Sequence, residues 1–262
     1  MVNIKCELYN DNFQNYKRYN IPKAQFVIAD IPYNVGENAY GSRPESLVDR
    51  DVKKGQSEKS HSYFFGTDGH FNIAEYMHFC SKMLIREPKE KGKSPCMMVF
   101  CSFEQISALV SYGNRYGFKH YIPLFFIKNY SPQVLKANLR IVGAMEYGVL
   151  LYREKLPKFN NNHRMIFNWQ QWKKDGKSIP KIHPTQKPIS VLKPLIELFT
   201  DEGDVVIDPC AGSGTTLRAA KELGRNSFGF ECFRPFYEKA VNEMLKSSLT
   251  DERTGYINYE EL

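Results

Sequence analysis

The chain alternates between short apolar runs and stretches with apolar residues at helical spacing, which predicts strands and helices in turn. The runs that predict strands cover residues 2–9, 25–29, 96–101, 121–127, 146–152, 205–208 and 227–230. Helical spacing covers residues 71–84, 103–117, 133–142, 188–199, 217–223 and 235–249. This alternation indicates the α/β class, with a mostly parallel sheet between two layers of helices. We expect seven strands, with the run at 121–127 at an edge because Pro123 has no N–H to donate.

The pattern over residues 205–223 predicts a buried strand, a tight loop and the start of a helix. Asp208 ends the strand, and the loop contains Gly212 and Gly214. Glycines let the backbone approach a ligand closely, and the free N–H groups of a helix N-terminus bind anions. Glu231 ends the next strand, where a carboxylate is placed to accept both hydroxyls of a ribose.

The residues that this loop lacks make two classes of ligand poor candidates. Leu217 stands where a dinucleotide site needs a small residue, and no Gly-Lys pair for a triphosphate is present. A ligand with a ribose and a small anionic group fits, and S-adenosylmethionine has both. The alternative is a strand–helix–strand unit that only packs.

The tetrapeptide Asp30-Ile31-Pro32-Tyr33 follows the strand predicted at residues 25–29. Proline fixes its own backbone angle and keeps Ile31 extended, so a stiff hook is expected at the carboxyl end of that strand. Open α/β sheets bind ligands at this edge. Taken alone, the tetrapeptide is more typical of an ordinary strand-ending turn, and only its pairing with the glycine loop favours a functional site.

Three blocks in a fixed order carry a family resemblance. The chain has D-I-P-Y at residues 30–33, I-H-P-T-Q-K-P at 182–188 and D-P-C-A-G-S-G-T-T at 208–216. They resemble the D-P-P-Y, H-P-T-Q-K-P and D-P-F-x-G-S-G-T-T blocks of the β-class amino-group DNA methyltransferases, and they span most of the chain. The chain departs from that pattern at Ile31, which replaces the first proline, and at Cys210 and Ala211.

The resemblance implies a Rossmann-like methyltransferase fold with a permuted order, in which the catalytic motif precedes the cofactor motif. It implies site-specific methyl transfer from S-adenosylmethionine to the N6 amine of adenine in DNA, as in restriction-modification systems. The catalytic residues that it implies are Asp30, Ile31, Pro32 and Tyr33. The cofactor-binding residues expected from the loop and the resemblance are Asp11, Thr185, Lys187, Asp208, Cys210, Ala211, Gly212, Ser213, Gly214, Thr215 and Glu231.

The chemistry of the hook follows from the weakness of the adenine amine as a nucleophile, since its lone pair is delocalised into the ring. Two acceptors, the Asp30 carboxylate and the Ile31 carbonyl, would draw the nitrogen towards tetrahedral geometry and free that lone pair. Methyl transfer then needs mainly alignment, which can lower a barrier by about 7–11 kcal/mol. Tyr33 is expected to stack on a base turned out of the duplex. Because Ile31 keeps the carbonyl, the missing proline is expected to reduce stiffness without abolishing activity.

The net charge of +7 is concentrated in one segment. Residues 153–187 contain nine Lys/Arg and two acidic residues, and the rest of the chain is neutral. Since cations neutralise phosphates, residues 153–181 are the expected DNA-contacting, target-recognition segment. The aromatic residues Phe167, Trp169 and Trp172 are either local core or platforms for bases. The expected DNA-binding residues are Lys158, Arg164, Lys173, Lys174, Lys177 and Lys181.

The remaining expectations concern organisation and compartment. Residues 1–262 are expected to form a single domain, with residues 34–69 as a lid over DNA or as a disordered loop. Six cysteines without a C-x-x-C pair, and no leader, favour a cytoplasmic protein, and no apolar run is long enough for a membrane. No metal ligation is expected, because the histidines and cysteines lack ligand spacing. The resemblance also implies a homodimer.

Three alternatives remain open at this point. Asp at the first position of the hook favours adenine in the family, but the N4 amine of cytosine is a second possible target. RNA or single-stranded DNA could replace duplex DNA as the substrate. The third alternative is a DNA-binding relative that has lost its chemistry through Ile31.

Overall fold

The computed structural model describes residues 4–33, 71–131, 141–183 and 185–246 of the chain. The strands are β1 (Cys6–Tyr9), β2 (Phe26–Asp30), β3 (Cys96–Cys101), β4 (His120–Ile127), β5 (Met145–Tyr152), β6 (Trp169–Gln171), β7 (Val205–Asp208) and β8 (Asn226–Phe230). The α-helices are α2 (Ile73–Met83), α3 (Gln105–Arg115), α4 (Ile189–Phe199), α5 (Thr215–Glu222) and α6 (Arg234–Lys239). A 3-10 helix, η1 (Phe13–Arg18), and a π-helix, η5 (Ala240–Leu245), complete the described elements.

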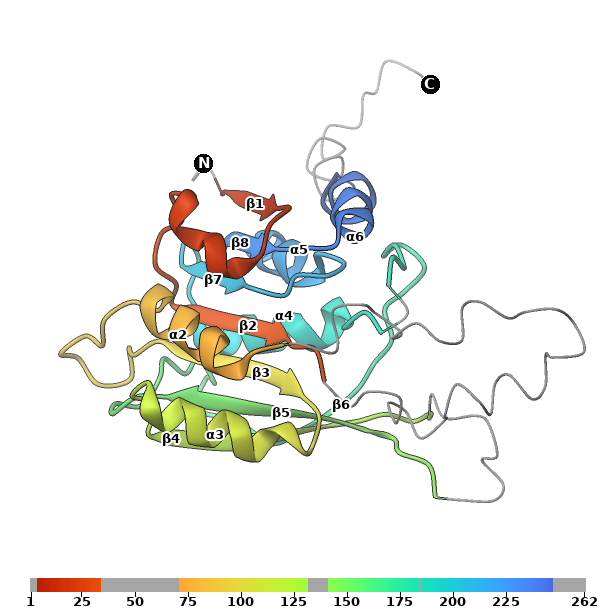
Figure 1. The fold of residues 1–262 in the computed structure, drawn as a ribbon. Helices are drawn as coiled ribbons and strands as arrows, with labels where there is room; N and C mark the ends of the chain where they lie inside the picture. The colour runs from red at the N-terminus through yellow and green to blue at the C-terminus, as the bar shows by residue number, and fades with distance from the viewer. Residues whose placement is uncertain (1–3, 34–70, 132–140, 184, 247–262) are drawn as a thin grey trace, which may run out of the picture.

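All the strands join one sheet, in the order β1-β8-β7-β2-β3-β5-β4-β6 (Figure 1). Five neighbouring pairs are parallel, and the two antiparallel pairs both contain β5. The mostly parallel α/β sheet is therefore confirmed, but the described residues form eight strands where seven were expected. The additional strand, β6, has only three residues, Trp-Gln-Gln, which is too short for its polarity pattern to predict a strand.

The sheet has a hydrophobic core on each face. Alternate residues of a strand point to opposite faces, so Phe26 and Ile28 of β2 pack with α4 and α5, whereas Val27 and Ala29 pack with α2 and α3. Figure 1 shows α2 and α3 in front of the strands and α4 behind them. The predicted helices on both faces are confirmed.

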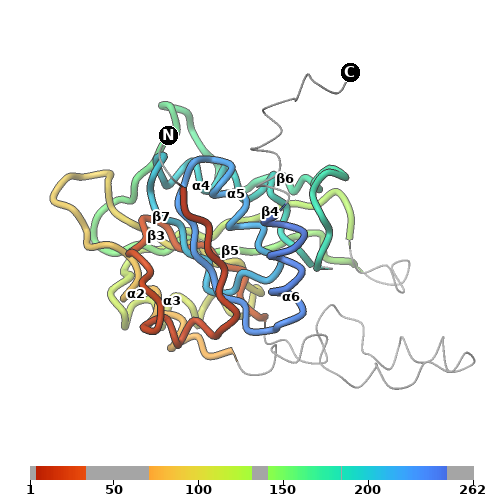
Figure 2. The backbone as a smooth tube through the Cα atoms, turned by 90° about the horizontal axis from the view of Figure 1, so that it is seen from above, coloured from red at the N-terminus to blue at the C-terminus, as the bar shows by residue number. Residues whose placement is uncertain are grey.

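The strand order reverses between β2 and β7, which are parallel neighbours in the middle of the sheet. From β2 the chain continues to β3 on one side, and from β7 it continues to β8 on the other. Open α/β sheets bind ligands at the carboxyl ends of the strands beside such a reversal. The hook follows β2 and the glycine loop follows β7, so the pairing of these strands brings the two distant segments to that point. Figure 2 shows the helices from above, with α2 and α3 on one side of the strands and α4 and α5 on the other.

Two expectations about single residues were wrong. Pro123 does not lie on an edge strand, because β4 pairs with β5 on one side and β6 on the other. The proline is tolerated because β6 pairs only with Phe125–Ile127 and leaves Pro123 beyond its reach. Phe103, expected on the apolar face of α3, precedes that helix and is 63% exposed.

Some expectations lie outside the described residues. They are the whole of the proposed lid, residues 34–69, and most of the helix expected at residues 133–142. In the described part of the chain, none of the helices combines the length and the hydrophobicity that a membrane crossing requires.

Candidate functional site

The hook after β2 is held on both sides by backbone hydrogen bonds. The Ile31 N–H donates to the Phe100 carbonyl of β3 at 3.2 Å. The Pro32 carbonyl accepts from the Gln105 side-chain amide at 2.8 Å, and the Gln105 side-chain oxygen accepts from the Ser102 N–H at 3.0 Å. The sequence did not indicate Gln105, because a glutamine at the start of a helix carries no signal for a partner 73 residues earlier.

Asp30 has two carboxylate oxygens in different environments. Its Oδ2 accepts a hydrogen bond of 2.6 Å from the Lys187 ammonium. Its Oδ1 is buried and has no hydrogen-bond partner among the described residues. Burial raises the pKa of Asp30, and the charge of Lys187 opposes that rise. Lys187 was expected to contact the cofactor, and in the structure its ammonium binds the Asp30 carboxylate.

Glu146, on β5, connects the hook to two lysines. Its Oε2 accepts from the Tyr33 hydroxyl at 2.7 Å, its Oε1 binds the Lys128 ammonium, and Lys187 lies 3.7 Å from Oε2. Burial opposes the charge of Glu146, but the two lysines outweigh it and lower its pKa to about 2. The sequence did not indicate Glu146 or Lys128, since neither belongs to a motif.

The buried Trp172 ring contacts the ammonium groups of the same two lysines. The Lys128 ammonium lies 4.7 Å and the Lys187 ammonium 5.9 Å from the ring centroid, which is cation–π range. Of the two roles considered for Trp172, the structure therefore supports local core. Trp169 is exposed and its ring stacks on Phe167, with centroids 6.2 Å apart.

The glycine loop has the tight turn that its sequence predicted. Gly212 has φ +51° and Gly214 has φ +76°, in the left-handed region that favours glycine. The Gly212 N–H donates to Glu231 Oε2 at 2.9 Å, so the loop and the end of β8 are joined. A Cβ added to Gly212 would meet nothing within 4 Å, so the loop borders open space there.

The carboxylates at the ends of β7 and β8 are perturbed by burial. Burial raises the pKa of Asp208 to about 7, against hydrogen bonds from Thr216 and the Cys210 N–H that lower it. Burial also raises the pKa of Glu231, against the Phe233 and Gly212 N–H groups. Strongly perturbed carboxylates at a sheet edge are typical of functional sites.

The rest of the predicted cofactor set lies around this loop. Cys210 is half-buried, and Ala211, Ser213 and Thr215 are buried, with the Ser213 and Thr215 hydroxyls 3.3 Å apart. Asp11 follows β1 and accepts from Asn15 at 2.6 Å and Tyr19 at 2.9 Å.

Thr185 belongs to the H-P-T-Q-K-P block and contacts its histidine. The N–H of Thr185 donates to His183 Nδ1 at 3.2 Å, and its hydroxyl lies 3.0 Å from the same nitrogen. The His183 ring packs edge-on against Phe236, with centroids 4.6 Å apart. Burial, with the nearby charge of Lys187, lowers the pKa of His183 to about 4.

The basic segment does not form one surface. Residue 153 follows β5, whose end pairs with the start of β3, at the sheet edge opposite the hook. The exposed Lys173, Lys174, Lys177 and Lys181 follow β6, which runs parallel to β4 and ends at the edge that bears the hook. Arg164 is also exposed and lies between these two parts.

Lys158 was expected to contact DNA, and the structure contradicts this. Its ammonium is buried and lies 2.6 Å from Asp201 Oδ2 and 2.9 Å from Asp204 Oδ2. An ammonium already held by two carboxylates is not available to a phosphate. The sequence pattern could not show this, because Lys158 and its partners are separated by more than 40 residues.

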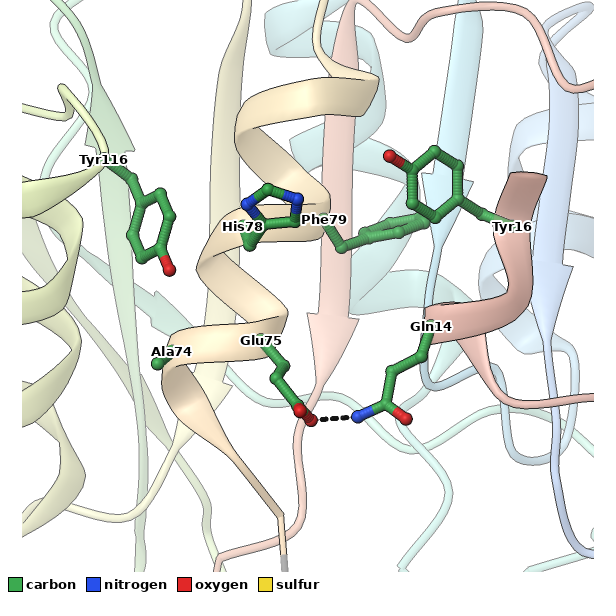
Figure 3. A pocket seen from close by; sticks show the side chains of 7 residues that line it. All are labelled: Gln14, Tyr16, Ala74, Glu75, His78, Phe79 and Tyr116. Atoms are coloured by element: carbon green, nitrogen blue, oxygen red, sulfur yellow. Dashed lines mark hydrogen bonds between the residues drawn. The ribbon is translucent and has the colours of Figure 1, made fainter.

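A cavity of about 350 Å³ opens elsewhere, between η1 and α2 (Figure 3). Figure 3 shows Gln14 of η1 reaching across to Glu75 of α2, with His78 and Tyr116 further along the cavity. None of the predicted site residues lines it. In residues 4–33, 71–131, 141–183 and 185–246, no group of three His, Cys, Asp or Glu side chains could hold a metal ion.

Comparisons with known proteins find similar sequences and similar folds. A family model described as DNA methylase matches residues 24–242. The Type II methyltransferase M.HindIII of Haemophilus influenzae is 29% identical over 177 residues, which are 63% of this chain and 55% of that protein. The chain covers 55% and 60% of the lengths of the first two curated relatives that it matches.

Two solved structures have a similar fold. The M1.HpyAVI-SAM complex has a TM-score of 0.63 and 21% identity, over 93% of this chain and 98% of that one. PvuII DNA methyltransferase (cytosine-N4-specific) has a TM-score of 0.62 and 14% identity, over 96% of this chain and 93% of that one.

Proposed function

Since the chain belongs to the DNA methylase family, we propose that it transfers a methyl group from S-adenosylmethionine to the N6 amine of adenine in DNA. The family match spans the hook, the H-P-T-Q-K-P block and the glycine loop. The Rossmann-like methyltransferase fold that the sequence predicted is confirmed by the two solved structures.

The cofactor site fits the residues at the ends of β1, β7 and β8. S-adenosylmethionine supplies an electrophilic methyl group when it is bound. The open space beside Gly212 admits a ligand against the backbone, and Glu231, already held by the loop, retains acceptor capacity for ribose hydroxyls. Asp11 lies on the same side, because β1 pairs with β8 and the Asn10 amide donates to the Glu231 carbonyl at 2.8 Å.

The observation that carries the proposal is the environment of Asp30 beside the glycine loop. One oxygen is bound by Lys187, and the other is a buried acceptor without a described partner. A buried acceptor is costly unless it is hydrogen-bonded, so Oδ1 favours a donor such as an exocyclic amine. Burial raises the pKa of Asp30, and the charge of Lys187 opposes that rise and so favours the charged form, which is the stronger acceptor.

Ile31 is compatible with this chemistry. Its N–H extends the β2–β3 hydrogen-bond ladder by one residue, which a proline at this position could not do. This bond compensates for part of the stiffness that the family proline would supply. It therefore argues against the alternative in which Ile31 has made the chain a non-catalytic DNA-binding protein.

Duplex DNA would lie across the sheet edge that bears the hook. The exposed Lys173, Lys174, Lys177 and Lys181 are available there to bind phosphates, and Arg164 is a further exposed cation. The target base would leave the duplex to reach Asp30 and stack on Tyr33. The homodimer and the lid at residues 34–69 stay predictions.

The proposal is tested by incubating the purified chain with labelled S-adenosylmethionine and duplex DNA, then identifying the modified nucleoside. We expect N6-methyladenine, and we expect Asp30→Asn to lower turnover by about 100-fold or more, because the variant removes a fixed negative charge beside the amine. The control is Glu202→Gln, an exposed carboxylate near the opposite end of β7, which should keep the parental rate.

Three outcomes would contradict the proposal in different ways. N4-methylcytosine as the product would replace adenine as the substrate and leave amine activation by Asp30 intact. Higher turnover on RNA or single-stranded DNA, at the same salt concentration, would remove duplex DNA as the substrate. No transfer by the parent chain, or full transfer by Asp30→Asn, would refute the mechanism.

A further inference from the structure

We infer that Glu146 is a positioning residue for the proposed reaction, holding Tyr33 and Lys187 so that Asp30 presents its free oxygen to the substrate amine. The inference rests on the proposed function, and it concerns a residue outside the three sequence blocks. Glu146 lies near the start of β5, opposite Phe126 of β4.

Glu146 contacts Tyr33 of the hook directly and is linked to Asp30 through Lys187. Its side chain is 16% exposed, and Oε2 accepts from the Tyr33 hydroxyl at 2.7 Å. The same oxygen lies 3.7 Å from the Lys187 ammonium, which lies 2.6 Å from Asp30 Oδ2 on its other side. One ammonium is thus shared between two carboxylates, and the second carboxylate also fixes the tyrosine.

The charges of this cluster balance only when Glu146 is ionised. Asp30 and Glu146 supply two negative charges, and Lys128 and Lys187, whose side chains are only 8% and 7% exposed, supply two positive ones. Burying unpaired charge is costly, so each ammonium needs a carboxylate at this depth. Without Glu146, Lys128 would lose its described ion pair, and Lys187 would lose one of its two described carboxylate neighbours.

Because Asp30 and Glu146 share Lys187, the lysine does not occupy Oδ1 of Asp30. An ammonium has three donors and can bind both oxygens of a single carboxylate if nothing else holds it. The second carboxylate draws Lys187 to one side and leaves Oδ1 for the amine. The negative charge of Glu146 also raises the pKa of Asp30, after the larger effect of burial, so the two carboxylates are electrostatically coupled.

The test is Glu146→Gln, which removes the charge and keeps an acceptor for Tyr33. We expect kcat/KM to fall about 10- to 100-fold, the usual cost of a misplaced reacting group. The acid limb of the pH profile should move to lower pH, because Asp30 loses its like-charged neighbour. A merely structural role for Glu146 would lower the amount of folded enzyme and leave the position of this limb unchanged.

The chain provides a matched control in Glu222. Its carboxylate also lies between two cations, 2.6 Å from Arg218 and 2.7 Å from Lys193, but at the end of α5 remote from the glycine loop. Glu222→Gln should reduce stability and keep both the parental kcat/KM per folded molecule and the parental pH profile. An equal shift of the acid limb in this variant would overturn the inference.

Tyr33→Phe tests the other end of the contact and keeps all four charges. We expect KM for DNA to rise several-fold, since the ring remains but its hydroxyl no longer bonds to Glu146 and Lys187. The acid limb should move to higher pH, opposite to its shift in Glu146→Gln, because the Tyr33 hydroxyl lowers the pKa of Asp30. An unchanged KM would mean that the contact with Glu146 does not position the ring, and would overturn this part of the inference. If Glu146→Gln does not fold, Tyr33→Phe still tests whether the contact between Tyr33 and Glu146 positions the ring.

A readout that needs no activity separates this inference from the proposed function. The Asp30 carboxyl carbon can be titrated by NMR in the parent and in Glu146→Gln, with Asp30→Asn used for its assignment. We expect a lower pKa of Asp30 in Glu146→Gln. An inactive parent refutes the proposed function, whereas an active parent with equal Asp30 pKa values and equal rates in the two proteins refutes the role of Glu146 alone.

Discussion

At the scale of single residues, the site depends on pairs of charges that no motif predicts. Lys187 belongs to a sequence block, and its ammonium binds Asp30, 157 residues earlier, which the block does not predict. Lys158 shows the reverse case, since a lysine expected to bind DNA is used as a buried structural cation. The type of a residue fixes what it can bind, and its neighbours decide what it does bind.

His183 leads to a prediction about pH at this scale. Its pKa falls from 6.5 to about 4 in the folded state. At pH values between these two, the unfolded chain binds a proton at His183 and the folded chain does not. The stability that His183 supports is therefore present above about pH 6.5 and is lost as the pH falls towards 4. Urea unfolding without cofactor at about pH 7.5 and about pH 5 measures this loss.

The comparison that isolates this effect is with His183→Gln. Between the two pH values, we expect the parent to lose about 1 kcal/mol more stability than the variant. This value is smaller than the full pKa shift implies, because solvent screens the half-buried His183 ring. Asp30, Asp208 and Glu231, whose pKa values are raised, act in the opposite direction in both proteins and cancel in the comparison. Equal losses in parent and variant would show that His183 is not held neutral.

At the scale of elements, the proposed site consists of the two turns that follow β2 and β7. Each turn is rigid for a different reason. The hook is fixed by Pro32 and by bonds from Ile31 to Phe100 and from Gln105 to Pro32. The glycine loop depends on left-handed residues before α5, and its first glycine borders open space.

Gly212→Ala tests the role of this loop, with Gly203→Ala as its control. Both glycines have positive φ, +51° and +83°, and an added Cβ would meet nothing within 4 Å at either. Each variant should therefore lose about 1 kcal/mol of stability from backbone strain. Only Gly212→Ala should also weaken S-adenosylmethionine binding, by about tenfold or more by calorimetry, because its methyl group enters the proposed cofactor space. Equal affinities in the two variants would exclude the loop as the binding site.

At the scale of the whole molecule, the basic segment is divided between the two opposite edges of the sheet. The basic segment starts at the edge opposite the hook and reaches the functional edge only after β6. Its buried member, Lys158, lies in the first part, where the Lys158 N–H bonds to the Ser94 carbonyl beside the start of β3. The DNA-binding surface is therefore expected to be smaller than the sequence segment.

Salt dependence measures which lysines bind phosphates. The double variant Lys173→Ala/Lys177→Ala should lower the slope of log K against log salt by about 1 for each phosphate that is no longer neutralised. The control is Lys91→Ala/Lys93→Ala, which removes two exposed lysines before the start of β3, at the opposite edge. This control should keep the parental slope, and a larger change in the control than in the test pair would place the DNA elsewhere.

The sequence by itself determined the α/β class, most of the element positions and the three blocks to which the proposal assigns the chemistry. These features are local, since periodicity depends on neighbours along the chain and a hook or a glycine loop is made of consecutive residues. The strand β6 escaped prediction because three residues are too few for a period.

Only the tertiary structure decided which side chains meet. The parallel pairing of β2 with β7 brings the hook beside the glycine loop, and the antiparallel β5 delivers Glu146 to Tyr33. These contacts join segments more than 100 residues apart, and they depend on strand order and register, which are set by the packing of the whole core. The sequence therefore identified the acceptor on Asp30, and the fold decided which of its two oxygens is free.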